Sequence, residues 1–203
     1  MLKKLAWSLV GGLSDPGKMP CHSYGLPARI ACPVGRKLSL IKGSVCWYCY
    51  ACTRNYMWPS VREAQARRFA ATKSSEWVEA MVTLISGMDF FRWHDSGDLY
   101  SDEYYKKILI VAHESSKTYF WLPSKEAGRV RRFAKEVPKN LTVRVSAPML
   151  DQYRPMEGFA TASVHKEGAP IGKRCSAKDN GGICGPCRDC WDKSIPNVSY
   201  PFH

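Results

Sequence analysis

The sequence lacks any run of about 18 apolar residues, which is the length that a helix needs to cross a membrane. It also lacks internal repeats and low-complexity tracts. The apolar stretch at residues 5–10, LAWSLV, is shorter than the ~7 to 15 residues of a signal peptide's apolar region, so we expect a buried first strand there. With 203 residues, of which 45% are hydrophobic, the chain can form one compact domain or one domain with an appendage.

Acidic residues are comparatively few. The chain has 18 Asp and Glu against 30 Lys and Arg, which gives a formal net charge of +12. Such a balance favours an anionic substrate or a nucleic acid as partner, although a generically basic protein would show it too. No bZIP, homeodomain or RNP1 motif is present, so the sequence does not support sequence-specific reading of nucleic acid.

Cysteine, by contrast, is abundant. The nine cysteines are Cys21, Cys32, Cys46, Cys49, Cys52, Cys175, Cys184, Cys187 and Cys190. Their odd number and their tight CxxC spacings argue against a secreted disulfide framework. We therefore expect metal or iron–sulfur ligation in a reducing cytoplasm.

The segment between the two groups of cysteines alternates helix and strand patterns. We expect helices at residues 59–72, 74–86, 101–115 and 124–137, the third capped by Ser101 and the fourth by Ser124. Strand patterns lie at residues 89–93, 118–123, 141–147 and 159–165. This alternation predicts βαβ units and a parallel sheet, and the chain is shorter than the ~250 residues of a complete eight-unit barrel.

We therefore expect a partial (β/α) barrel or an open sheet. The predicted division is a barrel over residues 1–170 and a cysteine-rich, cluster-binding extension over residues 171–203. In either arrangement ligands bind at the carboxyl ends of the strands. The loops of interest are residues 94–98, 123–126 and 146–148, and the residues after His165.

Four of the cysteines form a set near the end of the chain: Cys175, Cys184, Cys187 and Cys190. Bacterial ferredoxins use the same CxxCxxC spacing to ligate a [4Fe-4S] cluster. A structural zinc site made of four cysteines more often has two separated CxxC pairs. The spacing favours an iron–sulfur cluster, with zinc as the rival metal.

The other set contains the sequence CWYC, in which Tyr48 directly precedes Cys49. This resembles the end of the CxxxCxxC motif of radical S-adenosylmethionine enzymes. The compact first spacing is missing, because the nearest cysteine upstream of Cys46 is Cys32.

The chain also resembles the phage "gene product 88" family, which itself resembles short, divergent radical S-adenosylmethionine proteins. The matching pieces are MPCHSYGLPARIACPVGRKLSLIKGSVCWYCYA, RWHDSGDLYSDEYY, FWLPSKE, VRVSAP and the terminal C…CGPCRDCWD…NVSYPFH. The resemblance implies a phage or prophage origin, hence the cytoplasm of the infected host cell, with two cysteine-bound clusters and a barrel-like fold.

Carried over from the family, Cys32, Cys46 and Cys49 match the first cysteine set. Three thiolates would leave one iron open to S-adenosylmethionine, whereas a fourth ligand, Cys52 or Cys21, would close the cluster and leave electron transfer or structure. In the radical enzymes a loop after the second strand binds the methionyl ammonium, and this predicts that role for Ser96, Gly97 and Asp98. The alternative is that Asp98 only turns the chain before a helix. Tyr48 and His94 are further candidates for cofactor binding, with shielding of a cluster and a buried structural histidine as their alternatives.

The leading expectation is radical S-adenosylmethionine-like redox chemistry on an unknown substrate, with the second cluster supplying electrons or anchoring the substrate. An electron donor would then be a partner. The main alternative is a non-enzymatic electron-transfer or structural iron–sulfur protein. A third possibility is a zinc-stabilised module that binds nucleic acid.

Overall fold

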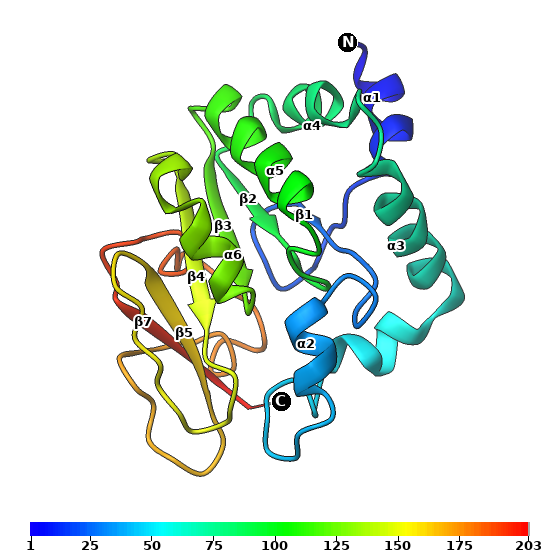
Figure 1. Cartoon of the computed structure of the whole chain (residues 1–203). Coiled ribbons are helices and arrows are strands. Elements are labelled where there is room, and N and C mark those ends of the chain that lie inside the picture. Colours follow the sequence, from blue (N-terminus) through cyan, green and yellow to red (C-terminus); the bar gives the residue numbers. More distant parts are fainter. Residues whose placement is uncertain (203) are drawn as a thin grey trace.

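The computed structural model describes residues 1–202, and its strands form one parallel sheet (Figure 1). The seven strands are hydrogen-bonded in the order β1–β2–β3–β4–β5–β7–β6, and each neighbouring pair is parallel. They are β1 Ser23–Tyr24, β2 Phe90–Trp93, β3 Tyr119–Ser124, β4 Leu141–Ser146, β5 Ala160–His165, β6 Lys173–Arg174 and β7 Asn197–Pro201. The predicted parallel α/β arrangement is thus confirmed. The sheet is not closed, since β1 and β6 lie at its two edges.

Six α-helices are found among the described residues: α1 Lys3–Val10, α2 Pro33–Leu38, α3 Pro59–Ala71, α4 Trp77–Ile85, α5 Asp102–Glu114 and α6 Ala127–Arg132. Three short 3₁₀ helices complete the set: η1 Tyr50–Cys52, η2 Arg54–Met57 and η3 Ala134–Glu136. None of the helices in residues 1–202 is long and apolar enough to cross a membrane.

The central helices begin and end close to where the sequence predicts. α3 starts at Pro59 in its first turn, where the missing N–H of proline costs nothing. α5 is capped by Ser101, whose hydroxyl accepts a hydrogen bond of 3.1 Å from the main chain of Tyr104. Because α5 buries Ile108, Val111 and other apolar side chains against the sheet, it holds the strand ends on either side of it in place.

Two predictions of secondary structure are wrong. Residues 3–10 form a helix instead of a buried strand, because the buried positions Ala6 and Val10 are four residues apart and pack on one side. α1 ends at Gly11, which adopts a left-handed conformation with φ 73°. The helix predicted from Ser124 begins only at Ala127, since Ser124 is the last residue of β3.

The two faces of the sheet are covered differently. Helix α5 lies over one face of the sheet (Figure 1), and α4 packs on α5. The large apolar core lies here and includes Phe91, Trp93 and Phe120 of the sheet. The other face carries a smaller cluster of Met19, Trp121 and Trp191, with several cysteines packed against it. That face is covered by the C-terminal segment.

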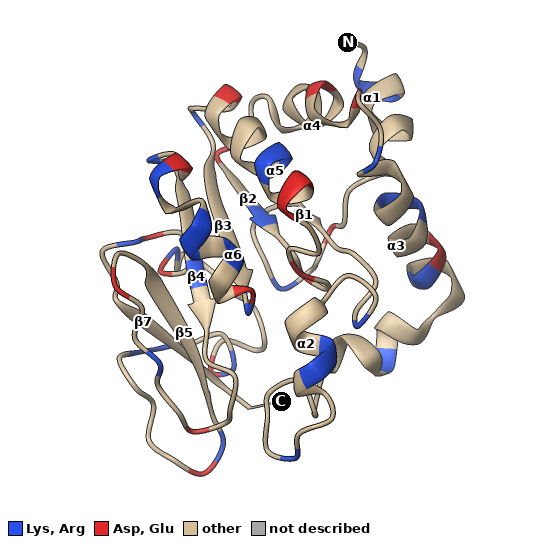
Figure 2. Ribbon diagram, viewed as in Figure 1, with Lys and Arg blue, Asp and Glu red and all other residues tan. Residues whose placement is uncertain are grey.

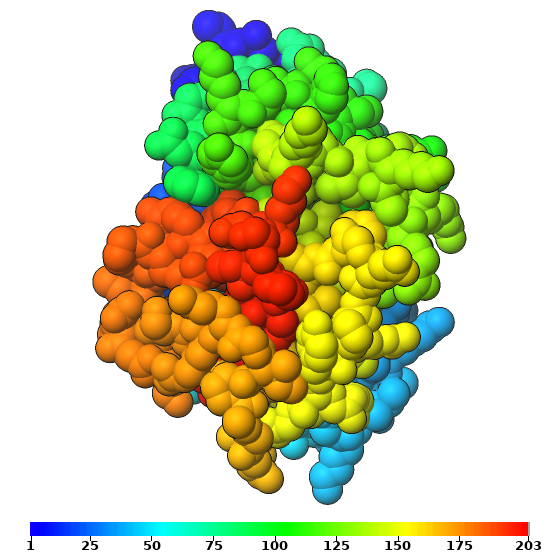
Figure 3. All heavy atoms as spheres, turned by 90° about the vertical axis from the view of Figure 1, so that its left-hand side faces the viewer, coloured from blue at the N-terminus to red at the C-terminus, as the bar shows by residue number. Residues whose placement is uncertain are grey.

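The residues after 170 contribute to the sheet itself. β7 is hydrogen-bonded between β5 and β6, five residues of it pairing with β5. In Figure 3 these C-terminal residues, orange to red, form one continuous surface with the yellow residues near 150. β2 and β4 also carry a basic residue each within the strand, seen as blue segments in the sheet (Figure 2). Both of these arginines bear on the site described next.

Candidate functional site

The first cysteine group is built around the short helix α2. Cys32 precedes its first residue, and Gly35 lies on its buried side. A Cβ at position 35 would lie 3.5 Å from the Sγ of Cys46, 3.9 Å from the Sγ of Cys32 and 3.0 Å from the Cβ of Cys32. Glycine therefore keeps free the space beside two of the predicted ligands, which fits a group that needs room next to both sulfurs.

The loop that carries Cys46 is tied to the carboxyl end of β4. The main chain of Val45 donates to Pro148 at 2.9 Å, that of Leu150 donates to Gly43 at 3.1 Å, and Ser44 forms a bridge with Met149. At the other side, the main chain of Val34 in α2 donates to the carboxylate of Glu126, which follows β3, at 2.6 Å. The first group thus lies over the carboxyl ends of the strands, where ligands of parallel sheets bind.

Cys49 and Cys52 are joined to this group. The main chain of Cys52 donates to the carbonyl of Cys49 at 3.0 Å, which places the two residues on one turn. Burial and the neighbouring Cys52 thiol together raise the pKa of Cys49 to about 11. Burial also raises the pKa of Cys32, and Asp98, Cys49 and Cys46 raise it further through their charges. All four thiols are therefore electrostatic neighbours at one edge of the sheet.

Within residues 1–202, no three Cys, His, Asp or Glu side chains lie close enough together to hold a single metal ion. The choice between iron–sulfur and zinc at either group therefore stays a prediction. The fit that can be tested is the space beside Cys32 and Cys46, and that space is present.

The predicted cofactor loop after β2 is held mainly by bonds within the protein. Asp98 accepts hydrogen bonds from the main chain of Leu99 at 2.7 Å, the hydroxyl of Ser124 at 2.6 Å and the main chain of Lys125 at 2.8 Å. Burial raises the pKa of Asp98, while these hydrogen bonds act in the opposite direction. An ammonium ligand would have to compete with Ser124 and Lys125 for this carboxylate.

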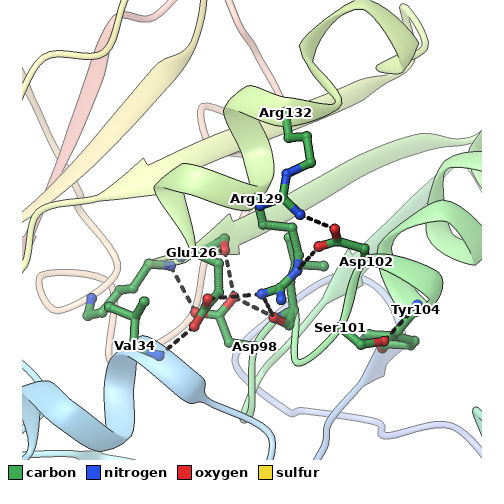
Figure 4. A network of polar contacts seen from close by, with 11 residues as sticks. Val34, Asp98, Ser101, Asp102, Tyr104, Glu126, Arg129 and Arg132 are labelled. Atoms are coloured by element: carbon green, nitrogen blue, oxygen red, sulfur yellow. Dashed lines mark hydrogen bonds and ion pairs between the residues drawn. The ribbon is translucent and has the colours of Figure 1, made fainter.

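The carboxylates next to Asp98 are engaged as well (Figure 4). Arg129 donates to Asp102 at 2.7 Å and to Glu126 at 3.0 Å, and Arg132 also pairs with Asp102. This network connects α2, the start of α5 and α6. Its role is to fix the loops under the first cysteine group.

The remaining predicted cofactor residues point in different directions. The Ser96 hydroxyl donates to Leu26 at 2.7 Å and accepts from Gln65 at 2.7 Å. Gly97 has φ +81°, and a Cβ there would lie 2.6 Å from Leu26, so only glycine fits. His94 is buried, with its Nε2 3.2 Å from the Tyr104 hydroxyl. Their roles in cofactor binding stay predictions.

The second cysteine group lies on the sheet face opposite the helices. Cys175 directly follows β6, and its charge raises the pKa of Cys184, Cys187 and Cys190. Burial is the larger cause in all three thiols and raises the pKa of Cys190 to about 12. Cys175 is thus an electrostatic neighbour of the other three cysteines, and their role as ligands of one cluster stays a prediction.

Cys21 joins the second group and not the first. Burial raises the pKa of Cys21 to about 11, and the neighbouring Cys184 contributes to this shift. The main chain of Cys184 donates to Lys18 at 2.9 Å, which holds the segment before Cys21 against the C-terminal loop. Cys21 therefore lies near the second group, whereas Cys52 lies beside Cys49, and the role of either as an extra ligand stays a prediction.

Two arginines beside the second group were not predicted as functional. Arg144 is fully buried and donates to the main-chain carbonyls of Asp189, Cys190, Asp192, Ile195 and Thr161. Arg92 stacks on Trp121, with 4.4 Å between its guanidinium carbon and the ring centroid, and lowers the pKa of Cys21 and Cys190. The signal that could have found them was a charged residue within each predicted strand, FFRW and LTVRVS.

Comparison with known proteins gives one family. A search of curated proteins and a search of solved structures each found no similar protein. The family model described as gene product 88 matches residues 3–173, most of the chain. This match includes the first cysteine group, the loop after β2 and β3 to β5. The chain therefore belongs to the gene product 88 family.

Proposed function

We propose that this protein is an iron–sulfur redox protein with two [4Fe-4S] clusters, one in each cysteine group. The observation that carries the proposal is the placement of Cys32, Cys46 and Cys49 at the carboxyl edge of a parallel sheet, with glycine at position 35 keeping space beside the sulfurs. That edge is where substrates and cofactors of such sheets bind. The second group, on the sheet face, is in a position to anchor a cluster that passes electrons.

For the first group, the leading hypothesis is radical S-adenosylmethionine-like chemistry. A cluster held by Cys32, Cys46 and Cys49 would leave one iron free to bind and reductively cleave S-adenosylmethionine. The protein's own residues would fix the site, since the Glu126 carboxylate accepts a hydrogen bond of 2.6 Å from the main chain of Val34 in α2. Partial burial of the cysteines would limit the access of water to them.

A second candidate is favoured by one contact. Cys52 lies on the same turn as Cys49 and affects its pKa by charge and by a hydrogen bond. As a fourth ligand Cys52 would close the cluster and leave an electron-transfer or structural role. The zinc-stabilised nucleic-acid module is supported only by the net charge of +12.

The test is made on anaerobically purified protein. Iron, sulfide and zinc are measured, and the EPR spectrum of the reduced protein is recorded with and without S-adenosylmethionine. About eight irons per chain, as two four-iron clusters require, and a spectrum shifted by S-adenosylmethionine would support the leading hypothesis. A full iron content with an unmoved spectrum would favour the closed cluster, and zinc without iron would overturn the proposal.

Two matched variants separate the candidates. Cys49→Ala should remove about half of the iron under both hypotheses. Cys52→Ala should leave the iron content unchanged if three cysteines suffice, and should remove about half of it if Cys52 is the fourth ligand. If Cys49→Ala retains all iron and an unaltered spectrum, the first site is misassigned.

A further inference from the structure

A concave site lies at the carboxyl ends of three adjacent strands. It has a volume of about 490 Å³ and is lined by His165, Lys166, Arg174, Lys178, Asp179, Pro201 and Phe202. His165, Pro201 and Arg174 are the last residues of β5, β7 and β6 respectively. A volume of ~300 to 1,000 Å³ is usual for small-molecule sites. None of these residues belongs to the proposed cysteine ligands.

The lining of this pocket is basic. Lys166, Arg174 and Lys178 face one acidic residue, Asp179, which is hydrogen-bonded to Arg174. Lys166 also has Glu167 at 3.7 Å, an exposed pair that contributes little. Burial lowers the pKa of His165, and the charges of Arg174 and Lys178 lower it further, against the opposite effect of Asp151. Three basic side chains thus line the pocket against one acidic side chain, and Lys178 has no ion pair among the described residues.

The basic loop of the pocket is ordered by the protein. Asp151 accepts hydrogen bonds from the main chain of Lys166 at 2.7 Å, of Glu167 at 3.3 Å and of Gly168 at 3.0 Å. His165 is fixed by a contact of 2.9 Å between its Nδ1 and the Ser199 hydroxyl. A ligand thus meets a loop whose backbone is already held in place.

Aromatic rings form one wall and connect the pocket to the first cysteine group. The ammonium of Lys166 lies 5.5 Å from the ring centroid of Phe202 and 5.8 Å from that of Tyr48, and the two rings meet edge to face at 5.3 Å. Tyr48 stands between Cys46 and Cys49, and Arg174 directly precedes Cys175. In Figure 1 the C-terminal end lies beside the segment that follows α2, in agreement with this contact. The pocket therefore lies next to both cysteine groups, with Tyr48 packed on its Phe202 and Lys166 and its Arg174 next to Cys175.

We propose that this pocket binds a nucleotide, with its phosphate on Lys166, Arg174 and Lys178 and its base against Tyr48 and Phe202. A guanidinium and two ammonium groups match phosphate oxygens, and an aromatic face next to them matches a base better than it matches an isolated inorganic anion. The nucleotide is either free or part of a single strand, since both present the same chemistry. A role of this nucleotide as the substrate rests on the proposed function, whereas its binding in the pocket is independent of that function.

The test uses the iron-containing protein with three probes: inorganic phosphate, AMP and a short 5′-phosphorylated single-stranded DNA. Binding is measured by calorimetry and by fluorescence anisotropy at two salt concentrations. We expect AMP or the DNA to bind at least tenfold more tightly than phosphate. AMP binding as tightly as the DNA identifies a free nucleotide, and binding of the DNA alone identifies a strand. Equal affinity for phosphate and both nucleotide probes, or no binding at all, overturns the proposal.

Charge reversal locates the site. Lys166→Glu and Lys178→Glu should each lower the affinity at least tenfold without changing the iron content. The matched control is Lys117→Glu, which has the same change in net charge at an exposed position just before β3, at the amino-terminal end of the strands, whereas the pocket lies at their carboxyl ends. A loss as large in Lys117→Glu would mean unspecific attraction to a basic protein and would refute the site. If Cys49→Ala loses iron but still binds the nucleotide probe, nucleotide binding does not depend on the first cluster, and the two proposals can be tested separately.

Discussion

Arg144 offers the sharpest test of how the cysteine-rich segment is held. Its guanidinium is fully buried in β4 and donates to five main-chain carbonyls, four of them in residues 189–195. No carboxylate among the described residues forms an ion pair with it. The hydrogen bonds from the Arg144 side chain therefore fix the backbone of the loop that contains Cys190.

The magnitude follows from these bonds. Hydrogen bonds to a charged group contribute ~1.5 to 3 kcal/mol each, and five of them at that rate would equal the whole stability of a typical domain, about 5 to 15 kcal/mol. The loss must be smaller, because the loop can detach and let water solvate its carbonyls. What is then lost is the docking of the loop, including the burial of Trp191 and its hydrogen bond of 3.0 Å to Phe91. We expect Arg144→Leu to lower the free energy of unfolding by about 3 to 5 kcal/mol.

Urea unfolding followed by circular dichroism measures this loss, and hydrogen exchange at the amides of residues 189–195 shows whether the loop detaches. Arg144→Lys should cost about 2 kcal/mol, since an ammonium has three donors where guanidinium has five. Arg131→Leu, at an exposed position of α6, is the control and should change the stability by less than about 0.5 kcal/mol. A loss below about 1 kcal/mol in Arg144→Leu, with unchanged exchange in the loop, would refute this account.

Three further predictions concern single positions. Gly35→Ala should remove about half of the iron, because its Cβ would lie 3.0 Å from that of Cys32 and fill the space beside the sulfurs. The control Gly128→Ala in α6, with nothing within 4 Å of the added Cβ, should keep the iron. Equal iron contents in the two variants would contradict the proposed role of Gly35. Burial lowers the pKa of His94 to about 3, so from about pH 6.5 downwards the unfolded chain binds a proton that the folded chain does not, and the free energy of unfolding should fall by up to about 1.4 kcal/mol per pH unit. His94 has a left-handed backbone with φ 55°, which asparagine tolerates, so His94→Asn should lack this share of the pH dependence; parallel curves for the two proteins would contradict it. Ser101→Ala should cost about 1 kcal/mol in urea unfolding through loss of the helix cap, and no change would mean that the cap is replaced by water.

The middle of the chain was predictable because its patterns are local. The apolar stripe of Trp77, Met81 and Ile85 and the cap at Ser101 both lie within one or two helical turns, and they specify α4 and α5. The prediction of a strand at residues 5–10 was wrong, because a six-residue apolar run fits a strand or a buried helix equally well when its packing partner is not known. α1 packs on α4, about 70 residues further along the chain.

The division of the cysteines into two groups was predictable, but their surroundings were not. The spacing of the cysteines names the two groups, and the position of Cys175 beside the CxxCxxC triplet agrees with that division. Nothing local indicates that Cys21 belongs with the C-terminal group, or that Asp98 is already hydrogen-bonded to Ser124. Both facts depend on contacts between distant segments, for which a single sequence carries no periodic signal.

Arg144 and Arg92 lie within the sheet beside the second cysteine group. A guanidinium in a sheet interior is costly unless its charge is compensated, and Arg144 finds only neutral carbonyls as hydrogen-bond partners. A cluster bound by four thiolates is negatively charged, and the charges of both Arg144 and Arg92 already lower the pKa of Cys190 against the effect of burial. Under the proposed function Arg144 therefore has two roles: it fixes the loop by hydrogen bonds, and its positive charge compensates the negative charge of the cluster. Arg144→Lys, which keeps the charge but not the five bonds, should then retain more iron than Arg144→Leu, beyond the difference that their stabilities explain. If the two variants contain equal iron when equal fractions of them are folded, the role of Arg144 is structural only.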